Sequence, residues 1–134
     1  MVRRTQDEDA AAISELDGEL FPAICWNENS VRRENKLGWG LVATTDKGKI
    51  VGFLMVRLDG RMADIIRVGV SKKYQGKGYG RAMLRRAIEE LGDGPMMLTV
   101  RKGNEPAKKL YVSEGFTPIA VAGEDALILV RDSE

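Results

Sequence analysis

Residues 68–81, VGVSKKYQGKGYGR, constrain the fold more than any other segment, because they run from a short apolar strand through a glycine turn into an amphipathic helix. The glycines at 76, 78 and 80 lack the Cβ atoms that keep an anion away from backbone N–H groups. Those N–H groups converge where the helix begins, and the helix dipole adds a partial positive charge there. Full positive charges surround the turn at Lys72, Lys73, Lys77 and Arg81. The segment therefore predicts a site for a diphosphate.

The spacing of the glycines indicates which kind of diphosphate ligand to expect. A nucleoside-triphosphate loop needs Lys followed by Ser or Thr after its last glycine, but Gly80 is followed by Arg81 and Ala82. A dinucleotide fold needs Gly-x-Gly-x-x-Gly, whereas these glycines are spaced two and two. The segment instead resembles the Gln/Arg-x-x-Gly-x-Gly/Ala motif of the GNAT family of N-acetyltransferases, with Gln75, Gly78 and Gly80 in the defining places.

A second segment carries the same resemblance. Residues 104–116, NEPAKKLYVSEGF, are similar to the family's Asn-x-x-Ala-x-x-x-Tyr-x-x-x-Gly-Phe segment, with Asn104, Ala107, Tyr111, Gly115 and Phe116 in place. The opening VRRTQDEDAAAISELD and the hairpin GKIVGFLMV also resemble the family's first strand and helix and its third strand. The resemblance covers nearly the whole chain. It implies an α+β fold in one domain, residues 1–134, with a mixed, mostly antiparallel twisted sheet of six to seven strands and about four helices.

Periodicity and turn residues give an order of elements that agrees with this fold. Thr5-Gln6-Asp7-Glu8 has the form of a capping box before a first helix, which ends at Phe21-Pro22. The remaining elements are expected in this order: a short helix at 29–34, an antiparallel meander with strands at 39–44, 50–58 and 62–70, a helix at 78–91, a strand at 96–100, a helix at 105–114, and a hairpin at 116–122 and 126–131.

Composition narrows the function classes. At 134 residues the chain is large enough for one domain with a core, and its net charge of +1 argues against a nucleic-acid binder. No apolar run approaches the length of a membrane span, so no membrane partner is expected. Cys25 is the only cysteine, which suits a reducing cytoplasm, and the absence of histidine excludes a Ser-His-Asp triad and a transition-metal site. A homodimer stays open.

The charges are unevenly distributed along the chain. The first helix is acidic, with Asp7, Glu8, Asp9, Glu15, Asp17 and Glu19, while residues 72–86 are basic. Two solvated helix faces would explain this pattern. A basic end for coenzyme A phosphates and an acidic end for a cationic amine would explain it equally well.

The resemblance implies that acetyl-CoA is the cosubstrate. Its diphosphate would lie on the turn formed by Gln75, Gly76, Lys77, Gly78, Tyr79, Gly80 and Arg81. Its pantetheine arm would bond strand backbone around Val68, Gly69 and Val70, where Gly69 either makes room for the arm or marks a bulge. Asn104 matches a family residue that contacts the arm, and it also stands where a helix N-cap is expected.

Acetyl transfer needs a proton donor for the departing thiolate and a base for the amine. Tyr111 aligns with the family's donor tyrosine, although a helix tyrosine can also simply fill the core. Asp64 is the first candidate base. Period-two alternation predicts that it shares a strand face with Ile66, Val68 and Val70, opposite Arg67. The alternatives are an ordinary charge near the hairpin mouth at position 64, and Glu28, Glu19 or a water molecule as the base.

These residues together predict direct transfer from acetyl-CoA to a primary amine, either of a small molecule or of a protein N-terminus or lysine. A cysteine acyl-enzyme is not expected, because Cys25 lies outside both motifs and no histidine exists to activate it. Residues 21–37 loosely resemble the acceptor region of ribosomal-protein N-terminal acetyltransferases through Phe21-Pro22 and Trp26. The competing interpretation is a domain that holds acetyl-CoA as a sensor or structural ligand without turnover.

Overall fold

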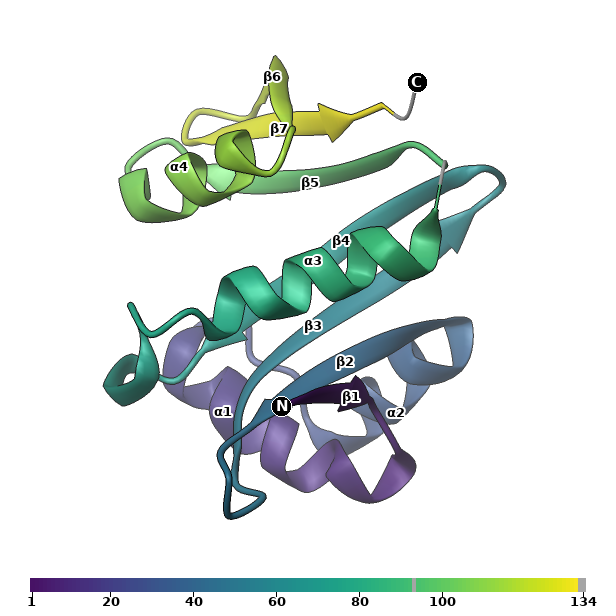
Figure 1. The fold of residues 1–134 in the computed structure, drawn as a ribbon, viewed down its shortest axis with the longest axis vertical. Coiled ribbons are helices and arrows are strands. Elements are labelled where there is room, and N and C mark those ends of the chain that lie inside the picture. The colour runs from purple at the N-terminus through teal and green to yellow at the C-terminus, as the bar shows by residue number, and fades with distance from the viewer. Residues whose placement is uncertain (93, 133–134) are drawn as a thin grey trace.

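A computed structural model describes residues 1–92 and 94–132 of the chain (Figure 1). The strands are β1 (Val2–Arg4), β2 (Gly38–Thr44), β3 (Ile50–Asp59), β4 (Met62–Val70), β5 (Met96–Arg101), β6 (Thr117–Ala122) and β7 (Ala126–Arg131). The α-helices are α1 (Ala10–Leu20), α2 (Glu28–Leu37), α3 (Tyr79–Leu91) and α4 (Glu105–Ser113), with short 3₁₀ turns η1 (Asp7–Asp9) and η2 (Lys72–Tyr74). This arrangement confirms the predicted α+β fold.

The strands form one sheet in the order β1-β2-β3-β4-β5-β7-β6. Every neighbouring pair is antiparallel except β4 and β5, which run parallel. Their ladder extends only from Ala63 opposite Met96 to Ile65 opposite Leu98. Beyond that point the two strands diverge, as Figure 1 shows, toward the side where β4 meets η2 and α3 begins.

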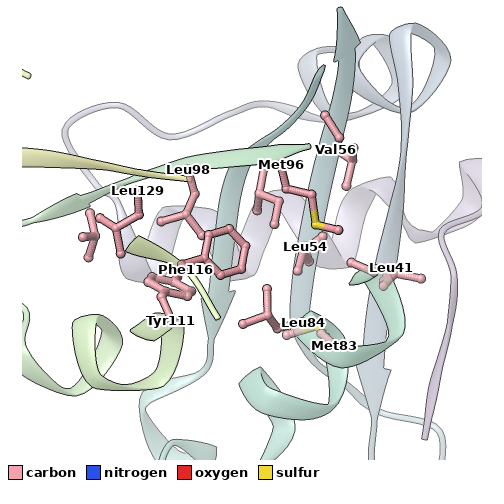
Figure 2. Close-up of a cluster of buried hydrophobic side chains, with 14 of the residues drawn as sticks. Leu41, Leu54, Val56, Met83, Leu84, Met96, Leu98, Tyr111, Phe116 and Leu129 are labelled. Carbon is pink, nitrogen blue, oxygen red and sulfur yellow. The ribbon is translucent and has the colours of Figure 1, made fainter. Parts of the chain in front are cut away.

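The helices cover the two faces of the sheet and bury two separate groups of side chains. On one face, α3 and α4 pack over residues such as Leu54, Leu98 and Phe116 (Figure 2). On the other face, α1 and α2 enclose Ile13, Val31, Phe53 and neighbouring side chains. The strand β4 therefore packs against helices on both faces, through Val68 on one face and Ile66 on the other.

A bulge in β4 overturns the predicted arrangement of its side chains. Arg67 lies opposite Met55 and Ile65 lies opposite Val56, so Ile66 is an extra residue with no partner in β3. Because a bulge breaks the period of two, Val68 packs on the α3 face while Ile66 packs on the α1 face. The expectation that Asp64 shares a face with Val68 and Val70, opposite Arg67, was therefore wrong.

Two helix starts also differ from the sequence prediction. The expected capping box at Thr5 and Glu8 is replaced by Asp9, whose carboxylate accepts the backbone N–H of Gln6 at 2.8 Å and pairs with Arg3 at 2.8 Å. The second helix begins at Glu28 and is longer than the predicted 29–34, because the Asn27 side chain accepts the N–H of Ser30 at 2.8 Å.

Candidate active site

A cleft of about 620 Å³ opens where β4 and β5 diverge. The residues that line it come from the end of α1, from β4, from the glycine turn and from α4. They include ten of the eleven residues predicted to bind the cosubstrate: Val68, Gly69, Val70, Gln75, Gly76, Gly78, Tyr79, Gly80, Arg81 and Asn104. Lys77 is the exception, since its exposed side chain lies beside the turn and outside the lining.

The glycine turn has the backbone conformation that its sequence requires. Gly76 and Gly78 have φ angles of 76° and 94°, which only glycine adopts readily, and Gly78 is the N-cap of α3. A Cβ atom on either residue would point into open space. The turn therefore presents bare backbone and the positive end of α3 to the cleft, which suits a diphosphate.

Gly80 and Gly69 differ in how closely their neighbours approach, which the sequence does not reveal. A Cβ atom on Gly80 would lie 3.7 Å from Leu110 and 3.8 Å from Val70, which is ordinary contact across the cleft. A Cβ atom on Gly69 would lie only 2.5 Å from the Leu20 side chain of α1. The end of the Leu20 side chain thus packs directly over Gly69, and a larger residue at this position would displace it.

Polar side chains fix the two ends of the cleft. Gln75 donates its side-chain N–H to the carbonyl of Val70 at 2.9 Å and so closes the turn onto β4. Asn104 accepts the N–H of Ala107 at 3.3 Å and caps α4, as predicted, while it also lines the cleft. Both side chains therefore shape the walls in addition to any contact with a ligand.

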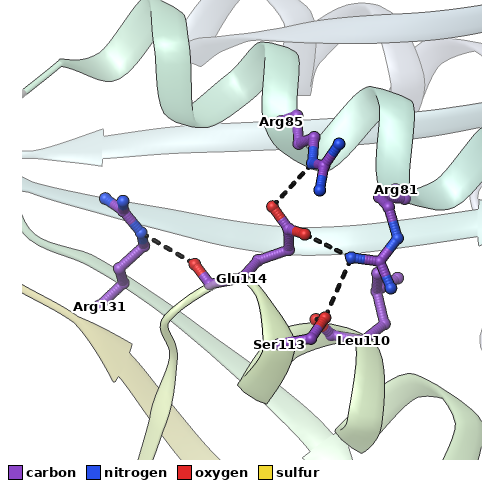
Figure 3. Close-up of polar contacts among 6 residues, drawn as sticks. All are labelled: Arg81, Arg85, Leu110, Ser113, Glu114 and Arg131. Carbon is purple, nitrogen blue, oxygen red and sulfur yellow. Dashed lines mark hydrogen bonds and ion pairs between the residues drawn. The ribbon is translucent and has the colours of Figure 1, made fainter.

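Arg81 links the two walls of the cleft (Figure 3). Its guanidinium group pairs with Glu114 at the end of α4 and donates to the hydroxyl of Ser113 at 3.0 Å. Arg85 bonds the other carboxylate oxygen of Glu114 at 3.1 Å, and Arg131 bonds its carbonyl at 3.0 Å. The pKa of Glu114 is lowered by the hydrogen bond from Arg85 and by Arg81. This contact holds α3 and α4 together across the diverging strands.

Tyr111 lies inside the cleft, at the edge of the core. It is 7% exposed, and its ring packs edge-on against Phe116 with the centroids 6.1 Å apart (Figure 2). The hydroxyl bonds no residue in the described part of the chain, where Thr5 Oγ1 is the single buried side-chain polar atom without a partner. The hydroxyl therefore opens into the cleft. Burial raises the pKa of Tyr111 to about 12.

Asp64 lies outside the cleft lining. It is half-buried on the α1 and α2 face, opposite Arg57, which pairs with Glu34 of α2. Burial raises the pKa of Asp64, and the charge of Arg57 offsets part of that effect. The rival carboxylates are exposed and already paired: Glu28 with Arg32 at 3.4 Å, and Glu19 with the backbone N–H of Lys72 at 3.1 Å.

Comparison with known proteins identifies this arrangement. The sequence model described as the acetyltransferase (GNAT) family matches residues 4–116. The chain belongs to the GNAT acetyltransferase family. Two relatives are an N-alpha-acetyltransferase, RimI, of Mycobacterium tuberculosis, 30% identical over 93% of this chain and 87% of the relative, and an L-amino acid N-acyltransferase, MnaT, of Escherichia coli, 28% identical over 89% and 80%.

The fold of this acetyltransferase is also that of its solved relatives. A crystal structure of the ribosomal-protein-S18-alanine N-acetyltransferase from Escherichia coli superposes with a TM-score of 0.87 at 24% identity, covering 100% of this chain and 94% of the other. The predictions of family, fold and enzyme class are confirmed. The protein is an acetyl-CoA-dependent N-acetyltransferase that acts on an amine.

The cleft of the acetyltransferase has the features that acetyl-CoA requires: bare backbone and a helix N-terminus for the diphosphate, then an apolar channel along β4 for the pantetheine arm. Sequence reasoning missed part of the lining, namely Leu20, Phe21, Tyr74, Pro106, Ala107 and Leu110. The resemblance of Phe21-Pro22 to an acceptor region was the one sequence signal for the wall formed by Leu20 and Phe21. No local pattern predicted that the end of α1 packs against Gly69.

The chain's described residues contain no helix long and apolar enough to cross a membrane. Within the same residues, no three side chains of Asp, Glu or Cys gather as a metal site would require.

Proposed function

We propose that this acetyltransferase acts by direct transfer on an α-amine, meaning an amine whose neighbouring carbon carries a carbonyl group, as at a protein N-terminus or in an amino acid. The relatives support this class, since one is named as an N-alpha-acetyltransferase and another as an L-amino acid N-acyltransferase. The observation that carries the proposal is the cleft, in which the glycine turn, Tyr111 and Phe21 line a single space.

In this proposal the cosubstrate lies along the cleft from the glycine turn to the bulge in β4. The N–H groups of residues 76–81 bind the diphosphate, and Lys77 adds charge from outside the lining. Backbone groups of Val68, Gly69 and Val70 bond the pantetheine arm, with Asn104 on the opposite wall. The thioester then lies near the bulge, where the backbone leaves its ladder and its polar groups are free to bond a ligand.

Tyr111 supplies the proton for the leaving group. The neutral amine nitrogen attacks the thioester carbonyl, the carbon–sulfur bond breaks, and the sulfur takes the tyrosine proton. The proton that the nitrogen loses as the amide forms passes through water to the phenolate and restores Tyr111. With a pKa of about 12, the phenol is fully protonated at neutral pH, so its proton is in place when the thiolate departs. Its hydroxyl is suited to this role because no described residue competes for it.

Asp64 is proposed as the base, and it would receive the ammonium proton through water because it lies outside the lining. A carboxylate whose pKa is raised by burial is better matched to this task than an ordinary one. Glu19 and Glu28 are weaker candidates, since both already have hydrogen-bond partners. A cytoplasmic location and a single functional domain, residues 1–134, complete the proposal.

Thiol release with two matched peptides tests the acceptor class. One peptide has a free N-terminal alanine and no lysine, and the other is N-acetylated and carries one lysine. We expect free thiol with the first and little with the second. Release with the lysine peptide alone would contradict the α-amine class. If acetyl-CoA binds by calorimetry but neither these peptides nor free amino acids release thiol, the sensor interpretation replaces catalysis.

A further inference from the structure

Arg67 in β4 forms an ion pair with Asp17 that connects β4 to α1 and to the segment between α1 and α2. Its Nη1 atom donates to both oxygens of Asp17 in α1 at 3.0 and 2.9 Å, and to the carbonyl of Ile24 at 3.1 Å. Asp17 is fully buried and also accepts the backbone N–H of Trp26 at 2.6 Å. The segment between α1 and α2 is therefore folded around one guanidinium group.

Two aromatic rings lie against the same guanidinium group. Its central carbon is 4.9 Å from the ring centroid of Phe21 and 4.3 Å from that of Trp26. Rings at these distances restrict the orientation of the planar guanidinium group. Further hydrogen bonds can then form only at its edge, where the N–H groups point. Phe21 in turn lines the cleft, so the group lies directly behind one wall of the site.

Part of this guanidinium group has no partner in the described residues. All three of its hydrogen bonds come from Nη1, and neither Nε nor Nη2 is among the buried unpartnered atoms. Both of these nitrogens therefore reach solvent, although the side chain is only 13% exposed. Three rigid N–H groups therefore remain available. Arg67 is not itself a lining residue, so these groups lie next to the cleft on the far side of Phe21, which lines it.

The charge of this group is already balanced by Asp17, so its free donors do not require an anion. They suit an oxygen acceptor, either a neutral carbonyl or a carboxylate, and the forked geometry favours an oxygen held at a fixed position. We propose that Arg67 determines acceptor specificity by donating hydrogen bonds to the carbonyl or carboxylate oxygen beside the acceptor amine. This inference rests on the proposed α-amine function and names the residue that recognises the α-carbonyl group.

A pair of small acceptors isolates this contact. Alaninamide and isopropylamine differ in that a methyl group replaces the carboxamide beside the amine. Rates of thiol release, compared at equal concentrations of the neutral amine, give a preference ratio for each protein. We expect the parent to prefer alaninamide. Arg67→Lys, which keeps the charge but loses the planar fork, should reduce that preference about ten- to a hundred-fold.

Two further variants separate recognition from folding. Arg4→Lys is the matched control, because Arg4 also stacks on an aromatic ring, 4.1 Å from Trp39, and pairs with Glu90, but on the distant strand β1. It should keep the parent's preference ratio. If Arg67→Lys does not fold, the uncharged pair Asp17→Asn with Arg67→Gln replaces it, since it leaves no lone buried charge.

The outcomes distinguish the two levels of the proposal. A parent that acetylates isopropylamine as well as alaninamide contradicts the α-amine class and the inference with it. A parent that acetylates neither contradicts recognition of the α-carbonyl group by Arg67, and the peptides described above then decide the α-amine class. If the parent prefers alaninamide and a folded Arg67 variant with unchanged acetyl-CoA affinity keeps that preference, Arg67 does not determine specificity. The α-amine class would still stand in that case. Loss of the preference in that variant and its retention in Arg4→Lys support it.

Discussion

At the scale of single residues, the hydroxyl of Tyr111 can be tested apart from its ring. Tyr111→Phe keeps the packing against Phe116 and removes one oxygen that bonds no described residue. The free energy of unfolding should therefore change by less than about 1 kcal/mol. Turnover should fall about 10²–10⁴-fold, with acetyl-CoA affinity unchanged by calorimetry. Equal turnover would make Tyr111 a core residue only.

The raised pKa of Tyr111 gives the same variant a second signature. In the folded protein the pKa of the Tyr111 phenol is about 12, whereas an unperturbed tyrosine has a pKa of 10.0. Above pH 10 the unfolded chain releases this proton first, so the stability that Tyr111 contributes declines between pH 10 and about pH 12. The melting temperatures of the parent and of Tyr111→Phe should therefore be similar below pH 10. Between pH 10 and about pH 12 the melting temperature of the parent should fall more than that of the variant.

Asp64 is expected to contribute opposite effects to activity and stability. Its pKa is raised in the folded state, so its stabilising contribution is lost as pH rises through that pKa, and the ionised carboxylate is unfavourable at pH 7. Asp64→Asn should therefore keep or slightly raise the melting temperature at neutral pH. It should also slow turnover, with a loss that shrinks at high pH, where more of the acceptor is already neutral.

The matched controls for Asp64 are the two rival carboxylates. Glu28→Gln and Glu19→Gln should leave the pH–rate profile close to that of the parent. If the pH–rate profile of Asp64→Asn matches that of the parent and the profile of one control changes, the glutamate replaced in that control is the base.

At the scale of elements, the glycine turn separates folding from binding. The backbone of Gly80 is not left-handed and its Cβ position has room, so Gly80→Ala should fold and bind acetyl-CoA nearly as the parent does. Gly80→Asp adds bulk and negative charge beside the diphosphate, and we expect it to fold but to lose measurable affinity in calorimetry. Gly78→Ala should instead destabilise the protein by about 1–2 kcal/mol, because the φ angle of Gly78 is 94°. Unchanged affinity in a folded Gly80→Asp would move the cosubstrate away from this turn.

Features that were predicted correctly are local in sequence. The start of α3 and the cap of α4 depend on residues within a few positions of one another, Gly78 and Asn104 above all, and the family motifs reinforced them. The bulge at Ile66 was not predictable, because it is a property of the pairing between β3 and β4. The pair of Asp17 and Arg67 joins residues 50 positions apart, and no periodicity in either segment indicates it.

At the scale of the whole molecule, one hydrophobic core spans the two parts of the sheet, but few polar contacts join them. The ladder between β4 and β5 is short, and Glu114 adds the contact from α4 to Arg81 and Arg85 in α3. These arginines are 41% and 65% exposed, so solvent screens the pairs and they should add little to the free energy of unfolding. We expect these pairs to fix the width of the cleft instead.

Glu114→Gln tests that role. We expect acetyl-CoA affinity to fall about three- to tenfold, because a cleft of variable width is less preorganised for its ligand. The stability should change little. Since the pKa of Glu114 is lowered, its contribution persists at neutral pH and is lost only as the pH falls through that lowered value. Glu90→Gln is the control, because Glu90 pairs with Arg4 and Arg86 at the far end of α3. Equal affinity in both variants would show that the contact does not shape the cleft.

The divergence of β4 from β5 gives this sheet four edges instead of two. Besides β1 and β6, the strand segments after Ile65 and after Leu98 each present unpaired N–H and C=O groups inside the sheet. Such inner edges can capture any extended chain, which is a liability that natural sheets ordinarily cover. Bound acetyl-CoA would cover the β4 edge, which lines the cleft, so the ligand-free enzyme should be the form most prone to strand-mediated association.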